Sequence, residues 1–70
     1  MNYNSLYFIN SREEMELISE NVKHNKVLKT IREFVNAKNP NFKIYYFRSW
    51  ETEEGIMYDV GSHTEFFLLK

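Results

Sequence analysis

The chain has 70 residues, a net charge of −1, no cysteine and only two histidines. This length predicts one domain, residues 1–70, and the absence of cysteine excludes disulfides. Nine basic and ten acidic residues argue against a dedicated nucleic-acid binder, which normally has a strongly basic domain. There is no run near the ~18 apolar residues of a membrane span and no signal-peptide layout, so we expect a cytoplasmic protein without a membrane partner, metal or cofactor.

Small size makes self-association an expected property of this chain. A domain of this length buries only about 60% of the surface that its unfolded chain exposes. Folds below roughly 70–80 residues usually add disulfides, a metal or oligomerisation. Aromatic residues make up 17% of the chain, and such side chains dominate both cores and interfaces. We therefore expect a homodimer.

Two local patterns describe the start of the chain. Residues 6–9, Leu-Tyr-Phe-Ile, predict a short strand with apolar side chains on both faces. Ser11, followed three residues later by Glu14, matches a capping box, in which the two side chains satisfy backbone N–H groups at a helix N-terminus. The pattern predicts a helix that begins at Arg12.

The hydrophobic phase of residues 12–38 favours two helices over one. A helix advances about 100° per residue, which gives two apolar stripes roughly half a turn apart. The stripes are Met15, Ile18 and Val22, then Leu28, Ile31 and Val35. We expect a break near His24 and Asn25, with Asn25 capping a second helix from Lys26 to about Lys38, before Pro40. The alternative is one long kinked helix over residues 12–38.

Three predicted strands follow, over residues 42–50, 56–60 and 64–69. Gly55 and Gly61 lie in the turns between them, where glycine gives backbone freedom. The predicted order is β-α-α-β-β-β. The fold class is therefore α+β, with an antiparallel sheet of about four strands and two helices packed on one face.

The predicted strands carry large apolar side chains on both faces, although a sheet with one wet face alternates apolar with polar residues. We expect one face to pack on the helices through Phe42, Ile44, Tyr46, Ile56, Tyr58, Phe66 and Leu68. The other face would present Tyr45, Phe47, Met57 and either Phe67 or Leu69 as an apolar patch. The residues expected to bind a partner are Tyr45, Phe47, Arg48, Trp50, Met57 and Phe67, although Trp50 is predicted on the same strand face as Phe42, Ile44 and Tyr46. Such residue types are enriched at interface centres. Stacking of single-stranded nucleic acid is a rival use, but only Lys43 and Arg48 supply positive charge there.

One stretch has the form of a catalytic motif. Residues 61–67, Gly-Ser-His-Thr-Glu-Phe-Phe, resemble the C-terminal signature of RelE/YafQ-type ribosome-dependent ribonucleases. The resemblance implies that His63 would act as general acid–base in mRNA cleavage and that Phe66 or Phe67 would be the closing aromatic. Histidine suits this role because its pKa lies near neutrality. The alternative interpretation is a turn between two strands, with Gly61 for backbone freedom and Ser62 for a local hydrogen bond.

We expect a small non-enzymatic protein-binding module that associates with itself. Its partner would be a host protein, whose surface it would occlude in the manner of an inhibitor. Eight Asn and a single Ala are typical of an AT-rich genome, and small chains without a catalytic set are typical of phage and mobile-element accessory proteins. The alternative function is the RelE/YafQ-like ribonuclease with His63.

Overall fold

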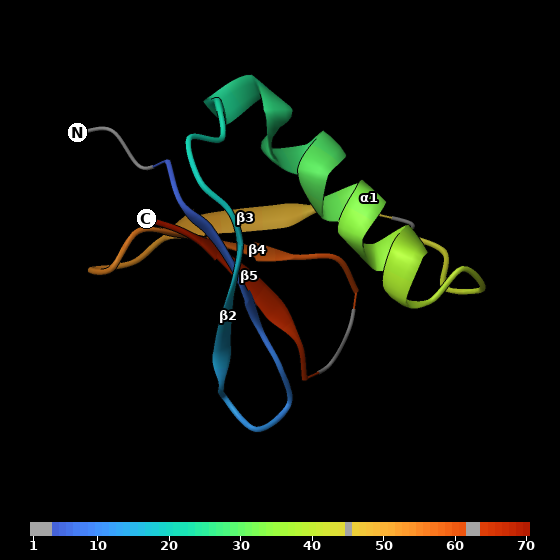
Figure 1. Cartoon of the computed structure of the whole chain (residues 1–70). Helices are drawn as coiled ribbons and strands as arrows, with labels where there is room; N and C mark the ends of the chain where they lie inside the picture. The colour runs from blue at the N-terminus through green and yellow to red at the C-terminus, as the bar shows by residue number, and fades with distance from the viewer. Residues whose placement is uncertain (1–3, 45, 62–63) are drawn as a thin grey trace.

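The computed structural model describes residues 4–44, 46–61 and 64–70, and these residues form one antiparallel sheet with a helix against one face (Figure 1). The elements in chain order are β1 (Leu6–Ile9), β2 (Met15–Ser19), the 3₁₀ turn η1 (His24–Lys26), α1 (Val27–Lys38), β3 (Arg48–Glu51), β4 (Ile56–Asp59) and β5 (Phe66–Leu69). The strand order across the sheet is β2-β1-β5-β4-β3. The α+β class and the antiparallel sheet are confirmed, with five strands and one α-helix among the described residues in place of about four strands and two helices.

The prediction of a helix beginning at Arg12 is wrong, because this segment is the second arm of a hairpin. β2 pairs with β1, placing Met15 opposite Ile9 and Leu17 opposite Tyr7. The turn is held by Asn10, whose Oδ1 accepts hydrogen bonds from the backbone N–H groups of Arg12 (2.9 Å) and Glu14 (3.0 Å). Asn10 Nδ2 also donates to Glu14 Oε1 at 3.0 Å. Glu14 therefore stabilises the hairpin turn through its bonds with Asn10, and the predicted capping box does not form.

The predicted second helix is close to α1, but its buried face is rotated. The helix begins at Val27, where Lys26 is the N-cap and makes no side-chain cap bond, and it ends at Lys38 before Pro40. Val27 and Ile31 are buried, whereas Leu28 is 44% exposed. The expected break near His24 is instead the short 3₁₀ turn that leads into α1.

The segment between α1 and β4 is less regular than predicted. Among the described residues of this stretch, Arg48–Glu51 alone pairs as a strand, while Phe42, Ile44 and Phe47 pack against the core from an irregular connection. Tyr46 is half exposed and does not join that core. The chain thus uses these apolar residues to close the side of the helix–sheet interface.

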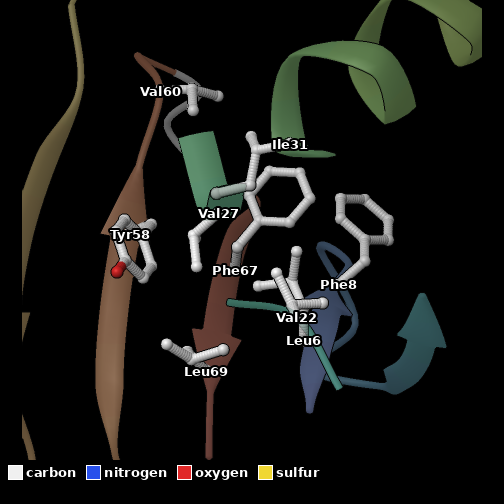
Figure 2. Packing of buried hydrophobic residues seen from close by; sticks show 9 residues of the cluster. All are labelled: Leu6, Phe8, Val22, Val27, Ile31, Tyr58, Val60, Phe67 and Leu69. Atoms are coloured by element: carbon white, nitrogen blue, oxygen red, sulfur yellow. The ribbon is translucent and has the colours of Figure 1, made fainter. Parts of the chain in front are cut away.

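The core lies between α1 and the sheet (Figure 2). Val27 and Ile31 of α1 face Phe67 of β5, and Phe8 of β1 lies opposite Phe67 in the sheet register. Three rings from β1, α1 and β5 interlock, since the centroids of Phe8 and Phe34 are 5.1 Å apart and those of Phe8 and Phe67 are 5.3 Å apart. The core cluster is Leu6, Phe8, Val22, Val27, Ile31, Tyr58, Val60, Phe67 and Leu69.

The face assignment of β5 is the reverse of the predicted one. Phe67 and Leu69 are buried in the core cluster, whereas Phe66 and Leu68 are not members of it. Because successive strand residues point to opposite faces, Phe66 and Leu68 lie on the side away from α1. Met15, which was expected in the core, also lies on that side and is exposed.

Candidate functional site

An unbroken row of apolar side chains crosses all five strands on the sheet face away from α1. Leu17 of β2 pairs with Tyr7 of β1, which pairs with Leu68 of β5. Leu68 pairs with Met57 of β4, which pairs with Trp50 of β3. Neighbouring positions on paired strands face the same side of a sheet, so these five residues form one continuous stripe.

We call this side of the sheet the open face. Its apolar side chains are Tyr7, Ile9, Met15, Leu17, Trp50, Met57, Phe66 and Leu68. The two ends of the row are accessible to solvent, with Leu17 46% and Trp50 41% exposed, whereas the central Leu68 is 1% exposed. The open face therefore has a close-packed apolar centre and accessible apolar edges.

A shallow groove of about 480 Å³ lies on the open face beside the β3–β4 turn. Its lining residues are Ile9, Trp50, Thr52, Glu53, Glu54, Met57 and Leu68. The turn is fixed by Thr52, whose Oγ1 donates to the Gly55 carbonyl oxygen at 3.0 Å and accepts from the N–H groups of Glu54 and Gly55, both at 3.1 Å. Gly55 is required here because a side-chain Cβ would collide with the carbonyl oxygen of Leu69. The rim of the groove is thus held on a defined backbone.

Trp50 forms one wall of this groove. Its ring meets the Phe66 ring edge-on, with the centroids 6.3 Å apart and the planes at 80°, a favoured geometry for aromatic pairs. The Arg48 guanidinium carbon lies 6.0 Å from the centroid of Trp50. These contacts hold the Trp50 ring in position while leaving part of it accessible.

Arg48 is bound to a buried carboxylate. Its Nη2 and Nε donate to Asp59 Oδ2 at 2.6 and 3.2 Å, and Asp59 Oδ1 accepts from the N–H of Gly61 at 2.9 Å. The Asp59 side chain is 5% exposed and that of Arg48 is 65% exposed. The hydrogen bond to Asp59, together with the charge of that carboxylate, raises the pKa of Arg48 above its ordinary value. Arg48 is therefore a paired cation at the margin of the open face.

The structure brings together three of the six residues predicted to bind a partner. Arg48, Trp50 and Met57 lie on the open face. The placement of Phe67 on an exposed surface is wrong, because its ring is in the core. Phe47 packs against the core margin, with the Arg32 guanidinium carbon 5.6 Å from its ring centroid. Tyr45 and His63 lie outside the described residues.

Sequence reasoning missed the β1 and β2 part of the open face. Tyr7 and Ile9 were recognisable because residues 6–9 are apolar at every position. Met15 and Leu17 were overlooked because their segment was assigned to a helix. The alternation Met-Glu-Leu at residues 15–17 is the strand signal that could have identified them.

A second concave site lies on the opposite side of the sheet, at the end of α1. It is a cavity of about 270 Å³ lined by Phe8, Phe34, Val35, Lys38, Asn39, Phe42, Val60, Glu65 and Phe67. Lys38 Nζ lies 4.1 Å from the centroid of the Phe8 ring and 5.7 Å from that of Phe34. The chain's own ammonium group therefore sits over two of the rings that line this cavity.

Within residues 4–44, 46–61 and 64–70, no three His, Cys, Asp or Glu side chains gather closely enough to hold a metal ion. Over that same part of the chain, every helix is too short or too polar to cross a bilayer. Comparison with known protein families, curated proteins and solved structures finds no match for this chain.

Proposed function

We propose that this protein is a small non-enzymatic binding module that occludes a surface of another protein with its open face. The observation that carries the proposal is the apolar row of Leu17, Tyr7, Leu68, Met57 and Trp50. Four of the five strands have four residues and β2 has five. At ~4.8 Å between strands and ~3.4 Å rise per residue, the sheet face spans a projected area on the order of 300 Å². Contiguous apolar surface that is exposed on a monomer often marks an interaction site.

Self-association through the same face is part of the proposal. Two sheets can stack face to face at about 10 Å with their side chains interdigitated, and the apolar row would supply the centre of such a contact. A stable interface buries about 800 Å² per partner. The surrounding rim of Arg48, Glu53, Glu54 and Lys70 would have to contribute the remainder.

The setting that we propose is that of an accessory inhibitor from a phage or mobile element, acting on a host defence or regulatory protein. The support is the small size of the chain and the composition of its open face, where Trp, Tyr, Phe and Met gather as they do at interface centres. In this mechanism the protein covers a surface of its target and performs no reaction.

The test compares two exposed leucines of nearly equal accessibility. Leu17 is 46% exposed on the open face, and Leu28 is 44% exposed on the outer side of α1. Leu17→Glu places a charge in the apolar row, so we expect it to convert a dimer to a monomer and to end partner capture. Leu28→Glu serves as the matched control and should change neither property.

The measurements are mass by light scattering and affinity capture followed by mass spectrometry, with circular dichroism to show that both variants fold. Species captured by wild type and by Leu28→Glu, but lost with Leu17→Glu, support the proposal. Identical mass and identical capture for all three proteins would contradict it. Loss with Leu28→Glu alone would place the binding surface on α1 instead.

A further inference from the structure

The groove beside the β3–β4 turn combines an apolar floor with an acidic rim. Ile9, Met57 and Leu68 supply aliphatic and thioether surface, and Trp50 forms the wall. Glu53 and Glu54 line the rim, and no lysine or arginine is among the described residues that line it. A ligand that fits this chemistry presents an apolar group with positive charge beside it.

The two rim carboxylates are available to a ligand. Both Glu53 and Glu54 are exposed, and across the described ranges of the chain neither side chain makes a hydrogen bond or ion pair. The turn that carries them is fixed through backbone groups and Thr52. A partner would therefore meet two carboxylates that are held near the groove and not already neutralised.

Two cations of the open face, Arg48 and Lys70, are engaged in contacts within the protein, and the Arg48 guanidinium carbon also lies 6.0 Å from the centroid of the Trp50 ring. Arg48 binds the buried carboxylate of Asp59 through two nitrogens. Lys70 Nζ lies 5.3 Å from the centroid of the Tyr7 ring. Neither residue lines the groove, so the carboxylates dominate its rim.

We propose that this groove recognises a polypeptide segment in which an apolar side chain is flanked by lysine or arginine. The apolar side chain would lie on Met57 and Leu68, and the flanking cations would meet Glu53 and Glu54. The same carboxylates would repel nucleic acid and anionic lipid, so the charge of the rim selects a basic protein partner.

The inference rests on the proposed function and names the chemistry of its partner. Its test uses three synthetic twelve-residue peptides without tryptophan. The first carries Leu-Phe-Leu flanked on each side by two lysines, the second has glutamate in place of lysine, and the third keeps lysine but has serine in place of the apolar residues. Trp50 is the only tryptophan of the chain, so its fluorescence and its indole N–H resonance report directly on the groove.

We expect the lysine-flanked apolar peptide to bind at least about tenfold more tightly than either of the other two. It alone supplies both an apolar group for the floor of the groove and positive charge for the carboxylates of the rim. Glu53→Gln combined with Glu54→Gln should weaken its binding about three- to tenfold. The control combines Glu16→Gln with Glu33→Gln, which changes the net charge equally at exposed positions outside the groove, and should leave the affinity unchanged. Binding should also weaken as salt is raised.

Equal binding of the lysine and glutamate peptides, or no change of the Trp50 signals at millimolar peptide, would overturn the inference. So would an equal loss with the control pair, since the effect would then reflect net charge and not the groove. Leu17 lies outside the groove. The Leu17→Glu experiment therefore tests the open face independently of the chemistry inferred for its partner.

Discussion

Tyr58 is an ionisable side chain whose burial links core packing to the pH dependence of stability. Its ring is buried in the core cluster, where it pairs across the sheet with Phe67. Burial disfavours the charged phenolate and so raises the pKa of the Tyr58 hydroxyl above its ordinary value of about 10. The folded protein therefore holds this proton to higher pH than the unfolded chain does.

The consequence is a loss of stability at alkaline pH. Between the unfolded and folded pKa values of Tyr58 the native state binds more protons than the unfolded state, so the free energy of unfolding falls as pH rises. The contribution of Tyr58 is complete below about pH 10 and decreases above it. Tyr58→Phe keeps the ring and removes the titration.

We expect Tyr58→Phe to lose less stability than wild type between pH 9 and pH 11. Urea unfolding at a series of pH values measures this difference, because the two proteins are identical at every other ionisable side chain. Parallel pH profiles for the two proteins would show that the Tyr58 hydroxyl titrates alike in the folded and unfolded states.

At the scale of elements, the β1–β2 hairpin shows why a segment whose sequence also fits a helix forms a strand. The spacing of Met15, Ile18 and Val22 fits a helix, and the alternation of Met15 and Leu17 fits a strand. The strand forms because β1 offers it a pairing partner and Asn10 closes the turn with three side-chain hydrogen bonds. Short apolar runs commonly fit both periods.

This assignment predicts that two neighbouring substitutions differ in their effect on stability. Asn10→Ala removes the side-chain bonds of the turn and should lower the free energy of unfolding by about 1–2 kcal/mol. Ser11→Ala should change it by less than about 0.5 kcal/mol, because Ser11 is exposed and caps no helix. Thermal or urea denaturation measures both, and a larger cost for Ser11→Ala would restore the helix-capping interpretation.

The sequence predicted the meander of β3–β5 and the position of α1, but not which face of β5 meets the core. All four residues of β5 are apolar, so their polarity carries no information about direction. The choice is made by the register with β1, which sets Phe8 opposite Phe67. Three of the six predicted partner-binding residues still reach the open face. Met57 alternates with Tyr58 as predicted, and the β3–β4 register sets Trp50 beside Met57 and Arg48 beside Asp59, which places Trp50 on the face opposite to the predicted one.

At the scale of the whole molecule, the sheet has a protected centre and two edges. β5 pairs with β1 on one side and with β4 on the other, whereas β2 and β3 each pair on one side only. Amide hydrogens of a central strand exchange only when the sheet opens around it. The stability of the backbone should therefore decrease from β5 outwards.

We expect the amides of β5 to exchange most slowly and those of β2 and β3 to exchange fastest. Hydrogen exchange followed by NMR at low protein concentration measures this order directly. Protection of β3 equal to that of β5 would contradict it and would indicate that the β3 edge is covered in solution.

The central position of β5 also constrains how the protein can be made. A nascent chain that has been synthesised only as far as Thr64 contains two separate hairpins, β1–β2 and β3–β4, and lacks the strand that joins them. The contacts that unite them span most of the sequence, as in the pairing of Leu6 with Leu69, and such long-range pairing is slow to form. During translation both apolar sheet surfaces therefore remain exposed until the last strand is available, and this is the interval in which the protein is most vulnerable to aggregation and proteolysis.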